Sequence, residues 1–366
     1  MINVWAYLPQ YNEEKKHIHA AIEKVLKSGK LILGDSVASF EREFSNYCNA
    51  KYGVGVNNGT DALFISLKTL DIGPGDEVIT VPNTAIPTVS SICAAGATPV
   101  FVDIDPETYL MDTSQIEKRI TKKTKCILPV HLYGQCCNMD HINKIAKKHR
   151  LYVIEDCAQG HGALWKGKIS GSMSTIAAFS FYPTKILGAY GDAGMVITNS
   201  EKYATKAKML RMYGMKPYGE YYSYIHGYNT RMDELQAEIL RFKLTKIGQY
   251  IKKRQAIAAR YDKLLKGIPI QLPKINTGSS HSYYLYVCRH KERDRILEHM
   301  KKNDINLNVS YKYPIHLMET YKYLGYKEGD FPATESTEKE IFSLPMYPEL
   351  SIKEQDMVIK TLKQFW

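Results

Sequence analysis

The chain is organised around the stretch Ser180-Phe-Tyr-Pro-Thr-Lys185-Ile-Leu-Gly188-Ala-Tyr-Gly191-Asp-Ala-Gly194. It places one lysine in a glycine-rich loop, directly after the apolar run 176–181 and before the apolar run 195–198. Both runs have the length and composition of short β-strands. A cationic side chain is thus expected on a tight turn between two strands, although a single lysine in a loop is usually only a solvated surface charge.

A second stretch favours a chemical role for Lys185 over that of a surface charge. Asp156-Cys-Ala-Gln159 follows another apolar run, residues 151–155, so its carboxylate also comes at a strand end. A lysine amine and a carboxylate held at strand ends are the two groups that a pyridoxal phosphate (PLP) site requires. The sequence therefore predicts a PLP site that includes Lys185 and Asp156.

The composition predicts a globular protein with a sizeable core. The chain has 366 residues, enough for two domains, and 44% of them are hydrophobic. The formal net charge of +11 favours polyanionic partners. The lysines are dispersed, however, and no long run of like charges marks a nucleic-acid-binding arm. We therefore expect solvated helix faces, a phosphorylated ligand and no nucleic acid partner.

The cysteines and the N-terminus bear on the compartment. Seven cysteines are scattered without a Cys-x-x-Cys pair, which fits neither a zinc site nor a disulfide framework. We therefore expect reduced thiols and no bound metal. Residues 1–7 lack the basic and long apolar segments of a secretory signal, and no stretch approaches the ~18–20 apolar residues of a membrane span. These features predict a cytoplasmic protein without a membrane span.

The N-terminal part of the chain carries helical periodicity. Apolar residues recur at three- and four-residue steps in residues 13–28 and 36–48. Further on, Gly59-Thr60-Asp61 supplies a turn and two N-cap candidates for a helix over residues 62–70. Because free N–H groups and the dipole at a helix N-terminus attract anions, this turn is a candidate phosphate site, although most such turns only cap a helix.

The middle of the chain alternates between strand-like and helix-like segments. In order they are strand 77–81, helix 87–95, strand 98–103, helix 112–119, strand 125–130, helix 140–149 and strand 151–155. This alternation predicts a parallel sheet covered on both faces, in which ligands bind at the C-terminal ends of strands. Four polar residues at or just past strand ends therefore predict a site there: Asp103, His131, Asp156 and Ser180.

The rest of the chain suggests a loop, a bridging helix and a smaller domain. Residues 213–224 form a packed surface loop or a flap over a ligand with an aromatic base, because they contain Tyr213, Tyr218, Tyr221, Tyr222 and Tyr224. A long helical pattern then runs from residue 227 to about 266, followed by strand 281–288, helix 293–303, strand 306–311 and helix 352–364. We predict a large PLP-binding domain over residues 1–250 and a small α+β domain over residues 251–366.

Eight motifs cover nearly the whole chain and are specific in their order and spacing. They are Gly34 with Phe40-Glu41, Gly59-Thr60-Asp61-Ala62-Leu63, Gly96-Ala-Thr-Pro-Val-Phe-Val-Asp103-Ile-Asp105, Glu155-Asp156-Cys-Ala-Gln159, Ser180-Phe181 with Lys185, Gly227-Tyr-Asn229-Thr-Arg231, Tyr313-Pro-Ile-His316 and Ser343-Leu-Pro-Met-Tyr-Pro348. Together they resemble the DegT/DnrJ/EryC1/StrS family of PLP-dependent nucleotide-sugar aminotransferases. The resemblance implies PLP fold type I, like aspartate aminotransferase, with a mostly parallel sheet covered by helices and a smaller C-terminal α+β domain.

The resemblance also implies site roles. Lys185 matches the catalytic lysine that binds PLP covalently and then moves a proton between the amino donor and the cofactor. Asp156 matches the carboxylate that keeps the pyridine nitrogen protonated. The other cofactor-binding matches are Gln159 beside the ring, the phosphate ligands Gly59, Thr60 and Ser180, and Asn229, which reaches the phosphate from the neighbouring subunit. This last match implies a homodimer with shared active sites.

Some site features stay open at this level. In many relatives the stretch that corresponds to residues 82–88 carries an aromatic residue that stacks on the PLP ring, and here Ala85 takes that position. Another side chain must then cover the ring, or its face is covered by aliphatic groups. Candidate substrate contacts are His161, Tyr182, Arg231 and His316. For His161, a turn residue satisfied by the backbone is an equally good interpretation.

The implied reaction has two halves. L-glutamate gives its amino group to PLP, and the amine form then aminates the keto group of a nucleotide-linked 6-deoxyhexose. The product is a deoxyamino sugar for a surface polysaccharide such as O-antigen, or for a glycosylated metabolite. We expect a dTDP-3-keto sugar and amination at C3, and the alternative is amination at C4 of a UDP- or dTDP-4-keto sugar.

Three other classes of protein were weighed against this function. A PLP-dependent sugar dehydratase of the family would have histidine in place of Lys185. A non-catalytic regulatory member would have little reason to keep both Asp156 and Lys185. A nucleotide-binding oxidoreductase would carry Gly-x-Gly-x-x-Gly after its first strand, a pattern that residues 54–59 only half fit.

Overall fold

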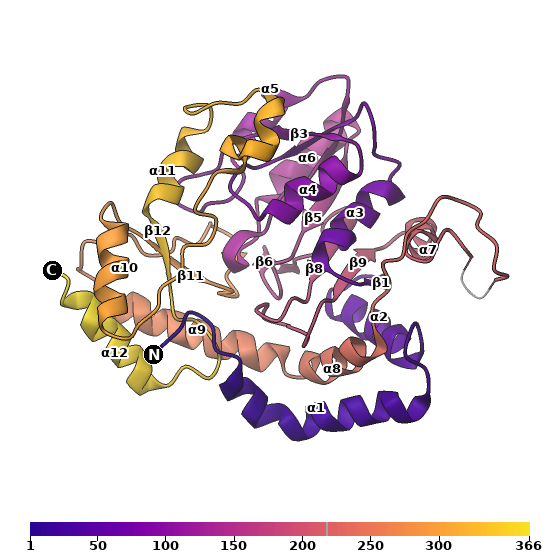
Figure 1. Ribbon diagram of the computed structural model, residues 1–366. Coiled ribbons are helices and arrows are strands. Elements are labelled where there is room, and N and C mark those ends of the chain that lie inside the picture. The colour runs from indigo at the N-terminus through magenta and orange to yellow at the C-terminus, as the bar shows by residue number, and fades with distance from the viewer. Residues whose placement is uncertain (217–218) are drawn as a thin grey trace.

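A seven-stranded sheet forms the centre of the protein (Figure 1). The computed structural model describes residues 1–216 and 219–366. The strands lie in the order β1 (Tyr52–Val56), β9 (Gly194–Thr198), β8 (Ile176–Ser180), β5 (Tyr152–Asp156), β4 (Thr124–Ile127), β2 (Glu77–Thr80) and β3 (Thr98–Phe101). Only β9 runs antiparallel to its neighbours within this sheet. The predicted α/β fold with a mostly parallel sheet is confirmed.

Helices cover both faces because the side chains of each strand alternate between two hydrophobic clusters. In β8, Ile176 and Ala178 pack in a cluster that includes α3 (Gly59–Thr69) and α7 (Glu201–Leu210). Ala177 and Phe179 pack in a second cluster with α2 (Asp35–Tyr47) and α8 (Glu234–Leu244). A strand buried on both sides in this way leaves its C-terminal end as the place for polar side chains.

The remaining elements of the N-terminal part surround this sheet. They are α1 (Leu8–Ser28), α4 (Ile86–Ala94), η1 (Thr113–Gln115), α5 (Ile116–Arg119), η2 (Leu132–Gly134), α6 (Met139–His149), β6 (Leu164–Trp165) and β7 (Lys168–Ile169). The predicted helix over residues 112–119 is thus only a turn followed by a four-residue helix. In the described residues, no helix has the length and apolar composition needed to cross a membrane.

The C-terminal part has its own hydrophobic cluster around a two-stranded antiparallel sheet. Its elements are α9 (Ile247–Leu264), β10 (Ser279–Ser280), β11 (Tyr286–Arg289), α10 (Arg293–Lys302), η3 (Ile315–Leu317), η4 (Glu319–Leu324), α11 (Pro332–Glu340), β12 (Ile341–Leu344) and α12 (Ile352–Lys363). Ile2, from the start of the chain, packs in the same cluster. The predicted division between residues 250 and 251 falls inside α9, so the two-domain division stays a proposal in which α9 is shared.

Three predicted segments differ from the structure because tertiary contacts interrupt them. The single long helix is two helices, since α8 ends at Leu244 and α9 begins at Ile247. The predicted strand 281–288 survives only as β11, because Tyr283 has a φ of 51° and Ser282 donates its N–H to the Gly134 carbonyl. Residues 306–311 form only an isolated bridge, between Asn308 and Ser343.

Asp103 is a helix cap rather than a site residue. Its Oδ2 accepts a hydrogen bond from the Ala333 N–H (2.9 Å), and its Oδ1 accepts from the N–H (3.0 Å) and the hydroxyl (2.8 Å) of Thr334. The carboxylate lies at the N-terminus of α11, where the helix dipole favours a negative charge. Asp103 follows β3, so this cap joins the central sheet to the C-terminal part of the chain.

This cap predicts a stability effect that depends on the acceptor atoms. We expect Asp103→Ala to lower the free energy of unfolding by about 1–2 kcal/mol, because two backbone N–H groups and a hydroxyl lose their acceptor. Asp103→Asn keeps one oxygen acceptor and should cost clearly less. Urea unfolding of the three proteins measures this difference, and equal losses for the two variants would contradict the assignment.

Candidate active site

The N-terminus of α3 meets the end of β8 at Gly59. Asn58 Oδ1 accepts from the Asp61 N–H (2.8 Å), and the first intrahelical bond joins the Ala62 N–H to the Asn58 carbonyl (3.0 Å). The N–H groups of Gly59 and Thr60 precede that bond and have no acceptor within the helix. A Cβ on Gly59 would lie 2.5 Å from Ser180 Cβ, so only glycine allows this approach. Two N–H groups and the Ser180 hydroxyl thus form a cradle suited to a phosphate.

Asp156 ends β5, the strand beside β8, and its carboxylate is buried. Its Oδ2 accepts from Thr88 Oγ1 (2.8 Å), and its Oδ1 accepts from the Ala158 N–H (3.1 Å). Burial raises the pKa of Asp156, and these hydrogen bonds and the charge of Lys185 only partly offset the effect. A further cation beside the carboxylate would remove the cost of burying it, and a protonated pyridine nitrogen is such a cation.

Gln159 is held between two tyrosines that the sequence analysis missed. Its Oε1 accepts from the Tyr133 N–H (2.8 Å), and its Nε2 donates to the Tyr311 hydroxyl. The two tyrosine rings stack with their centroids 6.3 Å apart. Tyr133 lies in the loop after β4 and Tyr311 lies in the C-terminal part, so only the folded chain brings them to Gln159.

Lys185 lies in the loop between β8 and β9. Its N–H donates to the Tyr182 carbonyl (2.8 Å), and its Nζ lies 4.8 Å from the centre of the Tyr284 ring. The Tyr284 hydroxyl is 3.1 Å from Thr184 Oγ1, next to the lysine in the chain. The charge of Lys185 also shifts the pKa of Asp156, as expected for two groups that share one site.

Helix α8 holds the loop that follows Lys185. Gln236 Oε1 accepts from the Tyr190 N–H (2.9 Å), and the buried Lys243 donates from Nζ to the Gly188 carbonyl (2.6 Å). Burial lowers the pKa of Lys243 to about 8, although two nearby glutamates partly offset the shift. The carboxylate of Glu234 in turn accepts three backbone N–H groups at the start of α2, each at 2.8 Å. The loop that carries Lys185 is therefore fixed to α8, and through α8 to the start of α2.

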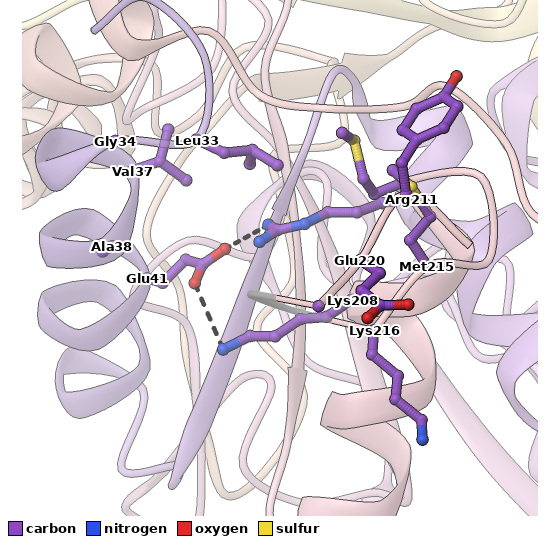
Figure 2. Close-up of a pocket in the computed structure, with 13 residues that line it drawn as sticks. Leu33, Gly34, Val37, Ala38, Glu41, Lys208, Arg211, Met215, Lys216 and Glu220 are labelled. Atoms are coloured by element: carbon purple, nitrogen blue, oxygen red, sulfur yellow. Dashed lines mark hydrogen bonds and ion pairs between the residues drawn. The ribbon is translucent and has the colours of Figure 1, made fainter. Parts of the chain in front are cut away.

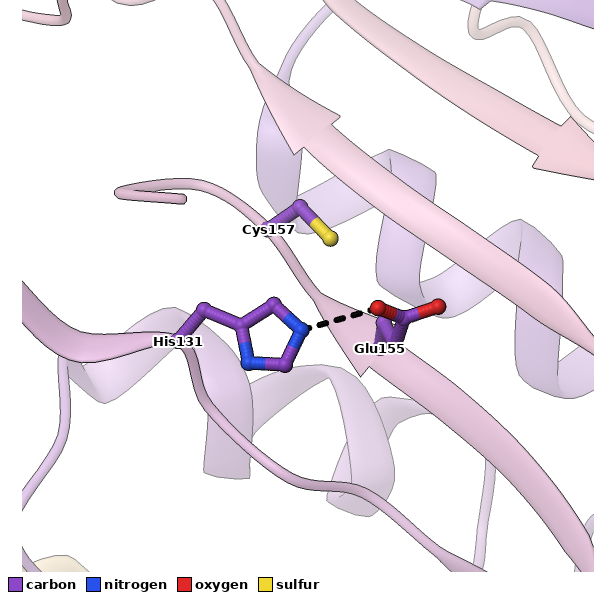
Figure 3. A group of neighbouring side chains, drawn as sticks. All are labelled: His131, Glu155 and Cys157. Atoms are coloured by element: carbon purple, nitrogen blue, oxygen red, sulfur yellow. Dashed lines mark hydrogen bonds and ion pairs between the residues drawn. The ribbon is translucent and has the colours of Figure 1, made fainter. Parts of the chain in front are cut away.

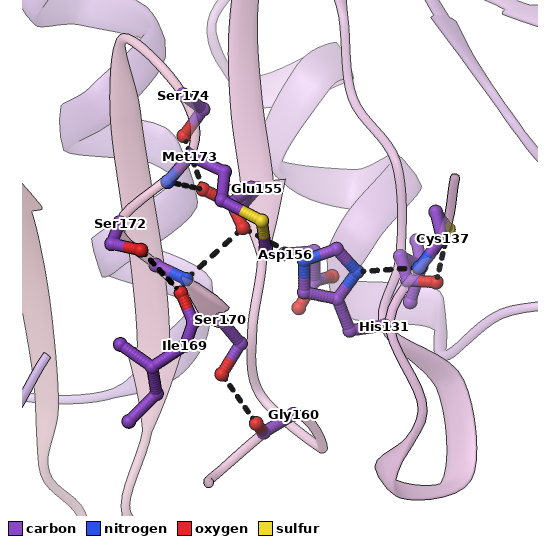
Figure 4. Close-up of polar contacts among 12 residues, drawn as sticks. His131, Cys137, Glu155, Asp156, Gly160, Ile169, Ser170, Ser172, Met173 and Ser174 are labelled. Carbon is purple, nitrogen blue, oxygen red and sulfur yellow. Dashed lines mark hydrogen bonds and ion pairs between the residues drawn. The ribbon is translucent and has the colours of Figure 1, made fainter. Parts of the chain in front are cut away.

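Glu155, the neighbour of Asp156, is the centre of a buried hydrogen-bond network (Figure 4). Its Oε2 accepts from His131 Nε2 (2.8 Å) and the Gly171 N–H (3.0 Å), and its Oε1 accepts from the Met173 N–H (3.0 Å) and Ser174 Oγ (2.7 Å). Four donors therefore satisfy the carboxylate. They fix the strand that carries Asp156 on its next residue.

Figure 3 shows that His131, Glu155 and Cys157 lie close enough to be considered as metal ligands. His131 Nδ1 accepts from the Cys137 N–H (3.2 Å), so the ring proton is on Nε2 and points at Glu155. Burial raises the pKa of the Cys157 thiol well above its usual value. The Glu155 carboxylate already accepts four hydrogen bonds and both ring nitrogens of His131 are hydrogen-bonded, so these two residues form a structural network. His131 thus supports the site indirectly, through its hydrogen bond to Glu155.

The two histidines predicted as substrate contacts are both buried. His161 packs against Phe44, Phe179 and Phe181, and its two ring nitrogens have no hydrogen-bond partner among the described residues. Burial and the charge of Lys185 lower its pKa to about 3, so its ring is neutral. His316 Nε2 lies 3.1 Å from Glu335 Oε1, and its buried ring packs against Phe331, a residue of the cluster that joins α4 and β3 to the C-terminal part. The contacts of His316 are those of a packing residue, and the substrate role of either histidine stays a prediction.

Asn229 and Arg231 lie at the edge of the sheet beside β1. Asn229 is exposed, Arg231 bridges to Val56, and the Asn57 N–H donates to the Thr230 carbonyl (3.1 Å). This segment therefore runs outside the first strand of the sheet, on a side that a second copy of the chain can approach.

Tyr182, the fourth predicted substrate contact, is 53% exposed next to the lysine loop. Its N–H lies 3.3 Å from Ser180 Oγ, and its carbonyl accepts the Lys185 N–H. Ala85 is the N-cap residue of α4, and its carbonyl accepts the N–H of Thr88 (3.1 Å), the residue whose hydroxyl donates to Asp156. What covers the ring face at Ala85 therefore stays open.

The tyrosine-rich segment after α7 projects from the body (Figure 1), and Tyr221 and Tyr222 are 92% and 60% exposed. Tyr218 lies outside the described residues. A cavity of about 330 Å³ lies between this segment, α2 and α7 (Figure 2). Its wall contains the ion pair between Glu41 and Arg211. This volume suits a small ligand. That the tyrosine-rich segment acts as a flap over a ligand with an aromatic base stays a prediction.

The fold and the grouping of Lys185, Asp156 and the α3 cradle are those of a PLP-dependent enzyme of fold type I. The residues present fit the cofactor, because the buried Asp156 carboxylate suits a protonated ring nitrogen and the N–H groups at the start of α3 suit a phosphate. The model of the DegT/DnrJ/EryC1/StrS aminotransferase family matches residues 12–363, and the chain belongs to this family.

Curated relatives agree with this assignment over nearly their full length. The chain is 47% identical to a dTDP-3-amino-3,4,6-trideoxy-alpha-D-glucose transaminase of Micromonospora megalomicea subsp. nigra, over 99% of this chain and 98% of the relative. It is 44% identical to a pleiotropic regulatory protein of Geobacillus stearothermophilus, over 98% and 96%. It is 43% identical to a dTDP-3-amino-3,6-dideoxy-alpha-D-galactopyranose transaminase of Aneurinibacillus thermoaerophilus, over 96% of each chain.

Solved structures give the same result. DesV of S. venezuelae superposes with a TM-score of 0.95 at 39% identity, over 97% of this chain and 95% of that one. NtdA of Bacillus subtilis, solved with bound cofactor PMP, superposes with a TM-score of 0.91 at 33% identity, over 97% and 82%. The chain is therefore a sugar aminotransferase that uses PLP.

The burial of Asp156 predicts opposite effects on the apoenzyme and on activity. In Asp156→Asn, the amide oxygen can accept from Ala158 while its nitrogen donates to Thr88 Oγ1, so the side chain fits without a charge. We expect the apoenzyme to melt at a higher temperature, whereas PLP binds more weakly and turnover falls about 10²-fold or more. Calorimetry of the apoenzyme and a PLP titration measure the two effects.

The pH dependence gives this prediction a sign. Because the folded pKa of Asp156 is above the usual 3.8, the folded apoenzyme holds a proton that the unfolded chain releases. Stability of the wild-type apoenzyme is therefore lost as the pH rises through the folded pKa, and Asp156→Asn escapes this loss. The gap in melting temperature between the wild-type and Asp156→Asn apoenzymes, measured by calorimetry, should widen from pH 4 toward neutral pH. A gap that narrows would contradict the model.

Lys243 is expected to act on Lys185 through the loop between them. In Lys243→Met the Gly188 carbonyl loses its donor, and we expect apoenzyme to take up PLP at Lys185 about tenfold more slowly, as a contact of 1–2 kcal/mol would give. The measurement is borohydride trapping followed by mass spectrometry of the Lys185 peptide. Lys246→Met, three residues further on, is the matched control and should take up PLP at the normal rate.

Proposed function

We propose that the enzyme moves the amino group of L-glutamate to a dTDP-linked 3-keto-6-deoxyhexose, with amination at C3. The observation that carries this proposal is identity above 40%, over nearly full length, to two relatives whose names specify dTDP-3-amino sugars. The product would be a deoxyamino sugar for a polysaccharide such as O-antigen or for a glycosylated metabolite. We also propose that the enzyme is located in the cytoplasm.

Lys185 and Asp156 carry the chemistry in this proposal. PLP supplies an aldehyde that reacts with amines and a ring that withdraws electrons when its nitrogen is protonated. The Asp156 carboxylate keeps a proton on that nitrogen, because a buried anion stabilises a cation beside it. The Lys185 amine takes a proton from the donor carbon and returns it at the neighbouring carbon, which general acid–base catalysis by one positioned group permits.

The other cofactor contacts follow from the positions of their donors. The N–H groups of Gly59 and Thr60 and the Ser180 hydroxyl would hold the phosphate at the start of α3, where the helix dipole adds to the attraction. Gln159, oriented by Tyr133 and Tyr311, would donate to the phenolate oxygen from its amide nitrogen. Each of these groups is fixed before the cofactor arrives, which lowers the entropy cost of binding.

A homodimer with shared active sites belongs to the proposal. Asn229 is exposed at the edge of the sheet, outside β1, and its side chain is free to reach a neighbouring copy. We propose that it contacts the phosphate in the partner's site, and that Arg231 lies near the substrate there. The tyrosine-rich segment beside it would cover the nucleotide base.

Two alternatives have specific support. The relative named as a pleiotropic regulatory protein is 44% identical, which keeps a regulatory role open for testing. Lys185 and Asp156 are both present, the charge of Lys185 acts to lower the pKa of Asp156, and a regulator has no need of that pair. Amination at C4 is the alternative within the reaction, and the names of the two transaminase relatives favour C3.

The decisive experiment follows both halves of the reaction with purified holoenzyme. L-glutamate should shift the visible spectrum and release 2-oxoglutarate, and a dTDP-3-keto-6-deoxyhexose should then restore the spectrum. NMR of the product places the new amine at C3 or C4. No spectral response to L-glutamate would overturn the proposed donor, and a protein that binds PLP but catalyses neither half-reaction would support the role of a non-catalytic, PLP-binding regulator.

Replacing the lysine tests its role directly. We expect Lys185→Ala to fold normally but to lose about 10⁴-fold or more of turnover, because both the covalent attachment and the proton transfer are gone. Steady-state formation of 2-oxoglutarate measures this loss. Lys202→Ala, at an exposed position of α7, is the control and should retain full activity. Near-normal turnover by Lys185→Ala would refute the assignment.

A further inference from the structure

A cavity of about 290 Å³ adjoins the lysine loop on the side of the C-terminal part. Its wall includes Thr184, directly before Lys185, and Tyr284, whose ring centre lies 4.8 Å from Lys185 Nζ. Tyr311, the hydrogen-bond partner of Gln159, also lines it. The cavity is therefore a neighbour of both the lysine and the group predicted to lie beside the cofactor ring.

Val4 and Trp5 form another wall of this cavity. The Ile2 N–H donates to the Asp304 carbonyl (2.8 Å), the Ile2 carbonyl accepts from Asn306 (2.8 Å), and the Val4 carbonyl accepts from Met346 (3.0 Å). These bonds hold residues 2–4 against the C-terminal part and thereby place Trp5 on the cavity wall.

The described residues that line the cavity carry no charged side chain and include both apolar and polar groups. Val4, Trp5, Leu285 and Met346 are apolar, whereas Thr184, Tyr284, Asn308 and Ser310 carry hydroxyl or amide groups. Asn308 Nδ2 donates to Ser310 Oγ (3.2 Å), so these two groups form a local pair. Among the described residues, no arginine, lysine or histidine lines it. A diphosphate or a dicarboxylate would need cationic partners, and this wall offers none.

We propose that this cavity binds the hexose ring of the nucleotide sugar. Trp5 would present its ring to the C–H groups and the C6 methyl of a deoxy sugar, and Asn308 and Ser310 would hydrogen-bond its hydroxyls. The volume is at the lower end of the range for ligand pockets and suits one sugar ring rather than a whole nucleotide sugar. This inference rests on the proposed function and adds to it the place and the partners of the sugar.

The test separates the two half-reactions of the holoenzyme. L-glutamate converts the PLP form to the amine form, and dTDP-3-amino-3,6-dideoxyhexose, used as the probe, does the same by the reverse of the second half-reaction. Both conversions are followed by rapid-mixing absorbance at several concentrations. We expect Trp5→Ala to raise the half-saturating concentration of the aminosugar about tenfold or more and that of L-glutamate less than about twofold.

Controls keep the outcome clear. Trp366→Ala removes a tryptophan that is 44% exposed and packs on His290 and Phe365, and both half-reactions should be unchanged. Trp5→Phe should recover most of the affinity for the aminosugar. Asn308→Ala, which trims an exposed side chain and keeps the backbone bridge to Ser343, should weaken binding of the aminosugar in the same selective way if Trp5→Ala folds poorly.

The results that would overturn the inference differ from those that would overturn the function. If the wild-type enzyme responds to both amines and Trp5→Ala and Asn308→Ala respond like it, the sugar binds elsewhere. Equal increases in the half-saturating concentrations of the aminosugar and L-glutamate would assign these residues to the shared reaction centre. That result would also overturn the inference. If the wild-type enzyme fails to respond to the aminosugar at all, the proposed substrate class is wrong.

Discussion

The site depends on one buried carboxylate that the protein leaves incompletely paired. Glu155 and Asp156 are consecutive residues of β5 and therefore point to opposite sides of the sheet. Glu155 accepts four hydrogen bonds and has a structural role. Asp156 accepts only one hydrogen bond on each oxygen, and its pKa is raised. A protein gains no stability from an underpaired buried anion. In our proposal a cationic ring nitrogen of PLP lies beside this carboxylate and offsets the cost of burying it.

The second group of the site, Lys185, is placed by contacts with distant segments. Its loop is held from one side by α8 through Gln236 and Lys243, and α8 is held by the start of α2 through Glu234. From the other side, Thr184 and Tyr284 join the loop to the C-terminal part. Three regions of the chain, α8, α2 and the C-terminal part, therefore hold the loop that carries Lys185, which ties formation of the site to the fold as a whole.

The sequence analysis could locate the residues whose predicted role follows from their immediate neighbours in the sequence. Gly59 precedes a helix, and Asp156 and Ser180 each end an apolar strand, so periodicity and turn chemistry located all three. Tyr133, Tyr311 and Lys243 have no such local signal, because each acts on a residue far away in the sequence. The same reason explains α11: its polar sequence lacks an apolar period, and its N-terminus is capped by Asp103 from the central sheet.

The division of charge in the site accounts for the way substrates can vary in this family. The α3 cradle and Asp156 face the phosphate and ring nitrogen of the cofactor in our proposal, so the strong electrostatic contacts serve the part that never changes. The cavity proposed for the sugar is neutral, and its selectivity has to come from shape and single contacts of about 1–3 kcal/mol each. Such contacts change with a few substitutions. Relatives above 40% identity can therefore carry the names of transaminases for a trideoxyglucose and a dideoxygalactose while sharing one fold.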